Sequence, residues 1–327
     1  MRSVADALSV LDALSGSDAL SAFSVLLMRG DVSFSGWWVS PSGFVVLERV
    51  GVVKVGHGRL LERGGRFLER WGLRQEGAPM SGQVSVVLPV VRGDGTRAVL
   101  KLQDLDEETA GEGLALRTWD GDGVVRLLDE DVESGTLLLE RLDEDRPLAG
   151  VPDVMKATSV LAGLLARITA VPAPAGLRRL DSVTAGMFER LPAVSRSLAA
   201  EEDRRLLADC AAALREVAGE PGDRLLHWDL HFENILAAER EPWLVIDPKP
   251  LAGDPCFDLL PALWNRCEEG ALARRFDLMT EVLGVERERA RAWTLGRVLQ
   301  NSLWRVEEGE ALDEDQVGIA LLLLGRR

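Results

Sequence analysis

The feature that most constrains this chain is a short polar loop that is followed by an apolar strand and a carboxylate. The loop reads His227-Trp228-Asp229-Leu230-His231-Phe232-Glu233-Asn234, and Asp247 ends the apolar run 243–246 that follows it. Phosphoryl transfer needs a carboxylate that accepts the proton of the acceptor hydroxyl, and it needs oxygen ligands for Mg²⁺ on the phosphates. Asp229 and Asn234 lie five residues apart on one loop and can face one cleft. The pattern therefore predicts Asp229 as the catalytic base, and Asn234 and Asp247 as metal ligands.

The alternative interpretation is a polar loop that contains a helix cap and a turn aspartate. A lone His-x-Asp would favour that interpretation, because three-residue patterns recur by chance. The full His-x-Asp-x4-Asn pattern, followed by an apolar strand and Asp247, is far more specific. We therefore predict an ATP-dependent kinase.

Lysine is scarce in this chain, and Lys101 lies inside a predicted strand. Only four of the 38 lysine and arginine residues are lysines, so each lysine needs a reason where arginine is the default cation. Lys101 stands between apolar neighbours in Ala98-Val99-Leu100-Lys101-Leu102. Its ammonium is a compact point charge that suits the α- and β-phosphates of ATP. The alternative is an edge-strand lysine that guards against aggregation.

Glu112 follows Lys101 by eleven residues and is a candidate partner for the lysine on the next predicted helix. Glu107 and Glu108 compete for this role, and a solvated helix face is the alternative for each of the three. We favour Glu112 because two nearby leucines, at positions 114 and 116, place this stretch near the core.

Two stretches of the predicted small lobe are candidates for nucleotide binding. Gly82 and Ser85 precede the first strand, where backbone N–H groups can cover phosphates, although an ordinary loop explains this stretch equally well. Glu140 and Leu142 lie where the last small-lobe strand connects to the helical part. We expect the backbone there to read the edge of adenine, on the basis of position alone.

The hydrophobic pattern predicts an α+β fold with a small β-rich lobe and a larger helical lobe. Turn-flanked β-rich runs predict strands, and apolar residues at helical spacing predict helices. The strands are expected over residues 84–91, 97–102, 124–128 and 136–141, with two more in 225–247. The helices are expected over 66–71, 106–119, 153–169, 184–199, 201–219, 256–265, 272–283, 286–305 and 316–324. We divide the chain into an unassigned extension (1–60, with a weak helix over 3–20), an ATP-binding N-lobe (61–142) and a catalytic, acceptor-binding C-lobe (143–327).

Charge and composition bear on the partners of the protein. With 53 acidic and 38 basic residues, the net charge is −15, and a nucleic-acid partner would need a basic face. An acidic surface favours cationic small molecules, although solubility explains it as well.

The cysteines, Cys210, Cys256 and Cys267, are too few and too far apart for a disulfide framework or a zinc site. We find neither a signal-peptide pattern nor an apolar run of the roughly 18–20 residues that span a bilayer. We expect a cytoplasmic protein without a membrane or an obligate protein partner.

These motifs resemble those of the aminoglycoside phosphotransferase-like kinases, and within them the streptomycin 6-kinase and hydroxyurea phosphotransferase family. The resemblance runs from about residue 67 to the C-terminus. The stretches that carry it are Ala98-Val99-Leu100-Lys101-Leu102, residues 116–128, the loop 227–234, Ile246-Asp247-Pro248-Lys249-Pro250 and Trp264-Asn265-Arg266.

The resemblance implies a two-lobed protein-kinase-like fold that uses ATP and Mg²⁺. It implies that Lys101 is a phosphate ligand and Glu112 its partner, that Asp229 is the catalytic base, and that Asn234 and Asp247 are metal ligands. Asp-Pro stands where protein kinases have Asp-Phe-Gly, and the Ala-Pro-Glu of their activation segment is missing after it, so a protein substrate is disfavoured.

The resemblance suggests, as phosphoryl acceptor, a hydroxyl of an aminoglycoside such as streptomycin, and with it a role in antibiotic resistance. A metabolic kinase for hydroxyurea or an amino sugar is one alternative. A nucleotide-binding pseudokinase is another, and the intact set of Lys101, Asp229, Asn234 and Asp247 argues against it.

Overall fold

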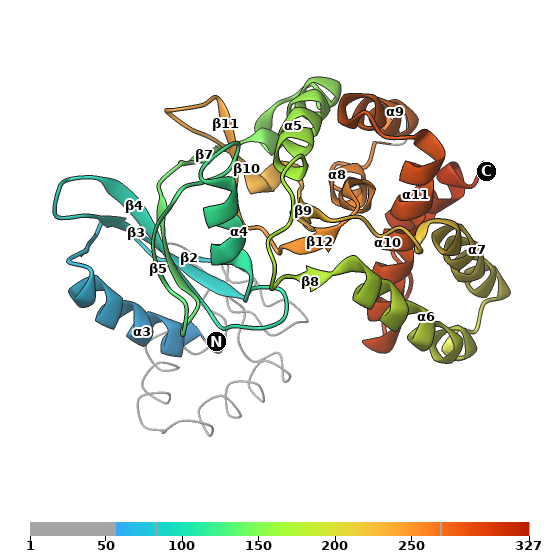
Figure 1. Ribbon diagram of the computed structural model, residues 1–327, viewed down its shortest axis with the longest axis horizontal. Helices are drawn as coiled ribbons and strands as arrows, with labels where there is room; N and C mark the ends of the chain where they lie inside the picture. Colours follow the sequence, from blue (N-terminus) through green and yellow to red (C-terminus); the bar gives the residue numbers. More distant parts are fainter. Residues whose placement is uncertain (1–56, 83, 269, 327) are drawn as a thin grey trace, which may run out of the picture.

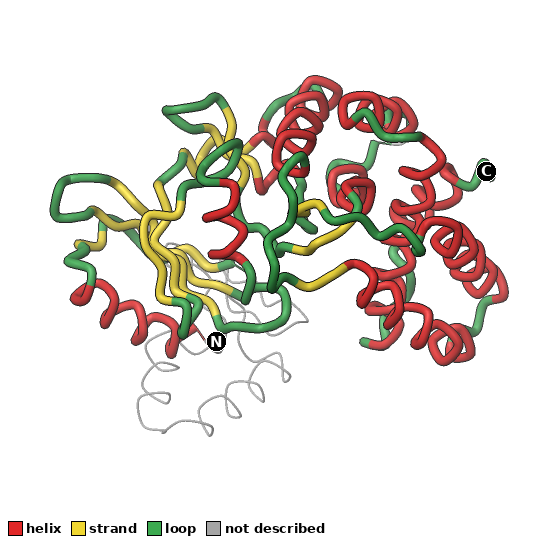
Figure 2. The backbone as a smooth tube through the Cα atoms, viewed as in Figure 1, coloured by secondary structure: helices red, strands yellow, loops and turns green. Residues whose placement is uncertain are grey.

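The chain folds into a sheet lobe and a larger helical lobe, as Figure 1 shows for the computed structural model. The structure describes residues 57–327, except Gln83, Glu269 and Arg327. The strands concentrate in the first lobe and the helices in the second (Figure 2). The predicted two-lobed α+β fold is confirmed. The weak helix expected over residues 3–20 lies outside the described residues, as does the expected extension up to residue 56.

The sheet of the small lobe is antiparallel, with the strand order β1-β3-β4-β6-β5 and with β2 paired to β3. The predicted hairpin is present as β3 and β4. Gly95 has φ +85 in the turn between them, a conformation that glycine adopts readily. The strands are β1 (Arg74–Gln75), β2 (Met80–Ser81), β3 (Ser85–Val91), β4 (Arg97–Gln103), β5 (Leu127–Asp131) and β6 (Thr136–Glu140).

Alternation along β4 sends its side chains to two different cores. Successive side chains of a strand point to opposite faces of the sheet. Leu100 and Leu102 pack with Leu60 and Phe67 of α3 (His57–Arg70). Lys101, between those two leucines, therefore points to the opposite face, where α4 (Glu112–Trp119) lies.

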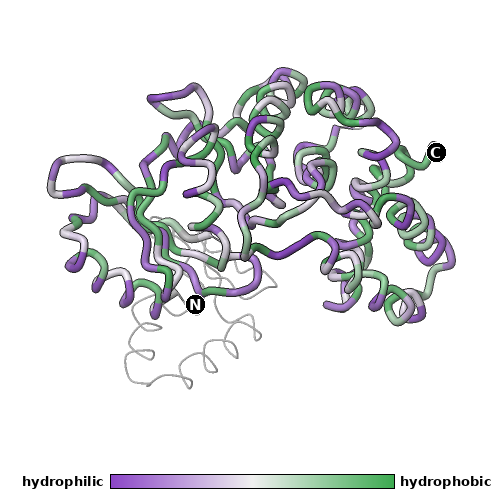
Figure 3. The backbone as a smooth tube through the Cα atoms, in the orientation of Figure 1, coloured by the Kyte–Doolittle hydropathy of each residue, from purple (hydrophilic) through white to green (hydrophobic). Residues whose placement is uncertain are grey.

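The helical lobe surrounds the larger of the two cores. Along its helices, hydrophobic and hydrophilic residues alternate within each turn (Figure 3), which is typical of helices with one buried face. At Gly296 of α10 an added Cβ would lie 2.6 Å from Leu214 of α7, so a glycine permits the close approach of these two helices. The helices are α5 (Val154–Thr169), α6 (Leu180–Ser197), α7 (Glu201–Val217), α8 (Leu259–Trp264), α9 (Leu272–Leu283), α10 (Arg287–Glu307) and α11 (Glu314–Leu323).

Short elements between the helices carry the polar loops of this lobe. Two small sheets have the orders β11-β10-β7 and β8-β12-β9. In the part of the chain that the structure describes, no helix is long and apolar enough to cross a membrane. The strands are β7 (Asp143–Pro147), β8 (Arg178–Arg179), β9 (Arg224–Leu226), β10 (Ile235–Ala237), β11 (Trp243–Val245) and β12 (Leu251–Gly253), and the 3₁₀ helices are η1 (Leu148–Gly150), η2 (Phe232–Asn234) and η3 (Pro255–Asp258). The division at residue 142 stays a prediction; β7, the first strand after it, pairs with β10.

Several predicted elements were wrong in their extent. The short helix expected over 66–71 is the end of α3, which begins at His57. The helix expected over 106–119 begins only at Glu112, because the Asp106 carboxylate accepts the N–H groups of Glu108 (2.8 Å) and Thr109 (2.9 Å) and forms a turn. The strand expected over 124–128 lies at 127–131 instead. Val125 donates its N–H to the Val245 carbonyl at 2.8 Å, which takes it out of the first sheet.

Arg240, in the turn between β10 and β11, joins that hairpin to the small lobe. Its guanidinium donates to the Glu140 carboxylate (2.7 Å), the Gly121 carbonyl (2.8 Å) and the Val124 carbonyl (2.5 Å). Both charged side chains are about four-fifths buried, at 21% and 19% exposed. The arginine therefore satisfies several polar groups that would otherwise be poorly hydrated.

We predict that Arg240→Ala lowers the free energy of unfolding by about 2 kcal/mol, because it leaves the Glu140 carboxylate without its charged partner. Denaturant unfolding measures this difference. Arg274→Ala removes an exposed arginine and is the matched control, expected to change stability by less than about 0.5 kcal/mol. Equal effects of the two substitutions would contradict the role given to Arg240.

Candidate active site

A buried ammonium group lies at the centre of the site. Lys101 Nζ is 2.7 Å from both carboxylate oxygens of Glu112 and also contacts Asp247. Gln103, two residues further along β4 and on the same face, donates to Glu112 at 2.7 Å. Of the three glutamates considered from the sequence, Glu112 is the one that contacts Lys101. Figure 1 places α4 between the sheet and the helical lobe, so this contact lies where the lobes meet.

Electrostatics favours the charged forms of Lys101 and Asp247. Burial alone would lower the pKa of Lys101, but the Asp247 and Glu112 carboxylates outweigh it and hold the pKa above its usual value. In turn, the Lys101 ammonium lowers the pKa of Asp247. The Asp247 side chain is still 46% exposed, so it is able to contact a ligand in the cleft while it remains paired to Lys101.

Asp258 holds the backbone of the polar loop in place. Its buried carboxylate accepts the N–H groups of His227 (2.7 Å) and Trp228 (2.9 Å), and burial raises its pKa to about 7. Trp228 has φ +71, a left-handed conformation that is unfavourable for a bulky residue. The Arg297 guanidinium lies 3.9 Å from the Trp228 ring. These contacts hold the loop in a backbone conformation that it would not adopt alone.

The imidazole of His227 links the two carboxylate-bearing segments. Its Nε2 lies 3.0 Å from the Ile246 carbonyl, immediately before Asp247. Its Nδ1 accepts the N–H of Asp229 at 3.3 Å. These contacts fit a neutral ring with its proton on Nε2, and burial lowers the pKa of His227 to about 4. His227 therefore sets the position of Asp229 relative to Asp247.

Asn234 and Asp247 are neighbours through their backbones. The Ile246 N–H donates to the Asn234 carbonyl at 2.9 Å, and Asn234 Nδ2 donates to the Asp229 carbonyl at 2.9 Å. That bond uses the amide nitrogen of Asn234 and not its side-chain oxygen. Among the described residues no group of three or more His, Cys, Asp or Glu side chains could hold a metal ion. One carboxylate and one amide oxygen fit Mg²⁺, which usually takes its remaining ligands from waters and substrate phosphates.

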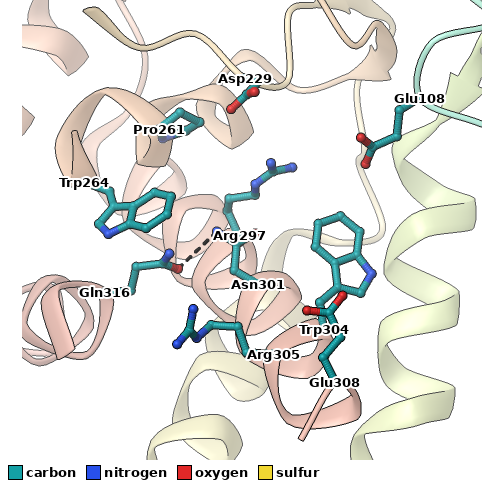
Figure 4. Close-up of a pocket in the computed structure, with 10 residues that line it drawn as sticks. All are labelled: Glu108, Asp229, Pro261, Trp264, Arg297, Asn301, Trp304, Arg305, Glu308 and Gln316. Carbon is teal, nitrogen blue, oxygen red and sulfur yellow. Dashed lines mark hydrogen bonds between the residues drawn. The ribbon is translucent and has the colours of Figure 1, made fainter. Parts of the chain in front are cut away.

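A cavity of about 540 Å³ opens beside Asp229. In Figure 4, Asp229 and Glu308 lie at opposite ends of it, with Trp264 and Trp304 on its two sides. Its size is typical of pockets for small-molecule ligands. The lining residues are Glu108, Asp229, Pro261, Trp264, Arg297, Asn301, Trp304, Arg305, Glu308 and Gln316.

The predicted nucleotide contacts lie at two ends of the sheet. Gly82 and Ser85 close the turn between β2 and β3, where the Gly82 N–H donates to the Ser85 carbonyl at 2.9 Å. Ser85 pairs with Gln103, two residues from Lys101. Glu140 pairs with Ala98 at the other end of β4.

At that other end, hydrogen bonds limit what Glu140 can offer a ligand. Its N–H donates to the Arg126 carbonyl at 3.0 Å, and its carboxylate is engaged by Arg240. Its side chain and N–H are therefore used by the fold. Leu142 is half-buried and packs against the larger core. The expected backbone recognition of adenine there stays a prediction.

Sequence reasoning missed three side chains of the site. Gln103 contacts Glu112, Arg297 packs on Trp228 and lines the cavity, and Lys249 Nζ lies 3.3 Å from Asp229 Oδ2. The scarcity of lysine was a signal for Lys249. Nothing in the local sequence marks Gln103 or Arg297.

The fold defines the class of protein first: it is that of the protein-kinase-like kinases. A solved structure of the aminoglycoside phosphotransferase APH(4)-Ia, in a ternary complex with AMP-PNP and hygromycin B, matches 79% of this chain and 96% of its own with a TM-score of 0.55. Its sequence identity is 18%, and the likeness shows the fold alone.

Sequence comparison then gives the family. The model of the aminoglycoside/hydroxyurea antibiotic resistance kinase family matches residues 70–309, and the chain belongs to this family. It is 63% identical over 263 residues to hydroxyurea phosphotransferase of Kitasatospora aureofaciens (80% of this chain, 77% of that protein). It is 57% identical over 268 residues to streptomycin 6-kinase of Streptomyces glaucescens (79% and 87%). The protein is a small-molecule kinase, and the resemblance seen in its motifs is confirmed.

We predict that His227 makes stability depend on pH in a defined direction. The folded protein keeps His227 neutral down to about pH 4, whereas an unfolded histidine binds a proton near pH 6.5. Between these values the unfolded chain binds more protons, so the contribution of His227 to stability falls as the pH falls. From pH 7 to pH 5, the stability of the wild type relative to His227→Gln should fall by about 2 kcal/mol.

Denaturant unfolding of both proteins at the two pH values measures this difference. Asp258, whose raised pKa gives an opposing contribution, is present in both proteins, so taking the difference cancels it. A constant difference between pH 7 and pH 5 would contradict a neutral, buried His227.

Proposed function

We propose that the protein transfers the γ-phosphoryl group of ATP, with Mg²⁺, to a hydroxyl group of a small polar acceptor. The observation that carries this proposal is the position of Asp229, which lines the cavity and is tied through His227 to the segment that bears Asp247. Asp229 thus lies at the acceptor cavity, and Asp247 lies beside Lys101. ATP is the donor in this proposal, and we expect the protein to act in the cytoplasm, where ATP is made.

The chain's own residues divide the work of the reaction. Lys101, held by Glu112, binds the α- and β-phosphates as a point charge. Asp229 orients the acceptor hydroxyl and accepts its proton as the new O–P bond forms. The bond to the β-phosphate oxygen breaks, and that oxygen keeps the electron pair in ADP.

Asn234 and Asp247 would hold Mg²⁺ in this proposal. The ion supplies neutralisation of the charge on the β- and γ-phosphates. The partly exposed Asp247 carboxylate and the side-chain oxygen of Asn234 are the donor types that Mg²⁺ prefers. Phosphate oxygens and waters would complete its coordination.

We propose an aminoglycoside of the streptomycin type as the acceptor. The cavity beside Asp229, of about 540 Å³, is suited to a molecule of several rings. Glu108 and Glu308 line it and can attract cationic groups, and Trp264 and Trp304 offer flat faces to sugar rings. The relationship to streptomycin 6-kinases supports this acceptor, and with it a role in antibiotic resistance.

Hydroxyurea is a second candidate, because the relative at 63% identity is a hydroxyurea phosphotransferase. Hydroxyurea is much smaller than the cavity, so an aminoglycoside would fill the cavity better. ATP turnover with Mg²⁺, measured in turn with streptomycin, other aminoglycosides, amino sugars and hydroxyurea, tests the proposal. Turnover with streptomycin but not hydroxyurea is expected; the reverse would exclude the aminoglycoside proposal, and turnover with neither would contradict both.

We predict that Asp229→Asn lowers kcat for the acceptor by about 10²–10⁴-fold, the usual contribution of a general base. Binding of Mg·ATP should stay close to that of the wild type, because Asp229 lies on the acceptor side. Steady-state kinetics and nucleotide titration measure the two effects. Wild-type turnover by the variant would exclude Asp229 as the base.

We predict that Asp247→Asn removes the Mg²⁺ dependence of ATP binding. The substitution takes away the one carboxylate of the proposed metal site, and it also removes a partner of Lys101. Titrating ATP with and without Mg²⁺ separates the two effects, because only the first depends on the metal. An unchanged gain in affinity on adding Mg²⁺ would contradict the metal role.

A further inference from the structure

Lys249 is a charged residue at the site to which neither the fold nor the family match gives a role. Its Nζ lies 3.3 Å from Asp229 Oδ2 and 3.5 Å from Glu108 Oε2. The side chain is 30% exposed, so part of its surface is open to solvent beside Asp229. Lys249 thus stands next to the proposed base, between the helical lobe and the turn that precedes α4.

The backbone of Lys249 is held firmly in place. Its N–H donates to the His227 carbonyl at 3.0 Å, which fixes it to the polar loop. Pro248 and Pro250 flank it, and both are buried. Proline fixes its own φ and restricts the residue before it, so the ammonium projects from a rigid support.

Lys249 lies close to where the phosphoryl group would be transferred. The γ-phosphoryl group must pass between the metal ligands and the acceptor hydroxyl that Asp229 orients. Lys249 lies two residues after Asp247 in the chain and its ammonium contacts Asp229, which places it beside the acceptor end of this path. Lys101, the other lysine of the site, contacts Asp247 itself.

The choice of lysine also points to phosphate. Arginine is the default cation of this chain, and its planar fork binds a carboxylate in a fixed geometry. A lysine ammonium is a compact charge with three rotatable donors, which can serve a carboxylate and a phosphate oxygen together. Of the three lysines that the structure describes, Lys101 and Lys249 lie at the site and Lys156 is exposed on α5.

We propose that Lys249 is a catalytic residue that binds the γ-phosphoryl oxygens during transfer. This inference rests on the proposed function. In the step, the acceptor oxygen bonds to the γ-phosphorus, its proton passes to Asp229, and the bond to the leaving oxygen of ADP breaks. Lys249 donates to the equatorial oxygens of the group in transit, where preorganised donors stabilise the transition state.

The test compares Lys249→Met and Lys249→Arg with Lys156→Met, which removes an exposed lysine. Lys249→Met should lower kcat with streptomycin by about 10²–10³-fold, whereas Lys249→Arg should recover part of the rate and Lys156→Met should match the wild type. An unchanged kcat in Lys249→Met, in a series where Asp229→Asn shows its predicted loss of kcat, would overturn the inference and leave the proposed function intact. A wild-type protein with no turnover on any acceptor would instead overturn the proposed function.

A second readout needs no acceptor and separates a catalytic role from a structural one. Calorimetry compares the affinity for Mg·ADP alone with that for Mg·ADP plus aluminium fluoride, which mimics the transferring group. Lys249→Met should bind Mg·ADP like the wild type but lose the gain that aluminium fluoride gives. Retention of the full gain, or an equal loss of affinity for both ligands, would overturn the inference. If Lys249→Met fails to fold, Lys249→Gln serves in the same comparison.

Discussion

The rest of the site depends on the burial of one ammonium group. Lys101 is only 6% exposed at the side chain, and a buried charge is strongly unfavourable unless it is paired. Its place in β4, between leucines that face α3, turns it toward α4 and the helical lobe. The fold therefore has to bring carboxylates to it, Glu112 from the small lobe and Asp247 from the large one. The same contact that satisfies the charge also fixes how the two lobes meet at the cleft.

The second constraint is the strained loop that carries Asp229. A tryptophan in the left-handed region is unfavourable, and the surroundings have to compensate. Asp258 accepts two successive N–H groups of the loop, and His227 ties the loop to the segment that ends in Asp247. Both residues are buried and neither faces the acceptor cavity. Their effect is to hold the position of the reactive carboxylates, which is how a rigid scaffold supports a site carried on loops.

The sequence predicted candidate site residues best where they lie within one segment of the chain. Asp229 and Asn234 share a loop, and Lys101 stands out as a lysine inside an apolar strand, so short-range features were enough to select them as candidates. Glu112 required a choice among three glutamates, and the nearby leucines pointed to the one that contacts Lys101. Gln103, Arg297 and Lys249 were missed because their importance comes from contacts with other segments of the folded chain, with Glu112, Trp228 and Asp229 respectively. The helix expected from residue 106 was wrong for a local reason: the Asp106 side chain competes for backbone N–H groups, as aspartate often does.

The two lysines of the site have matching surroundings. Lys101 lies between Glu112 and Asp247, and Lys249 lies between Glu108 and Asp229. In each group the glutamate comes from the 108–112 segment of the small lobe and the aspartate from the large lobe. Each group of two carboxylates and one ammonium has a formal net charge of −1, so neither group by itself attracts a triphosphate. Arg297 adds positive charge on the Asp229 side, where it lines the cavity. At the Lys101 group, a divalent cation that enters with the nucleotide would supply the positive charge that the phosphates need.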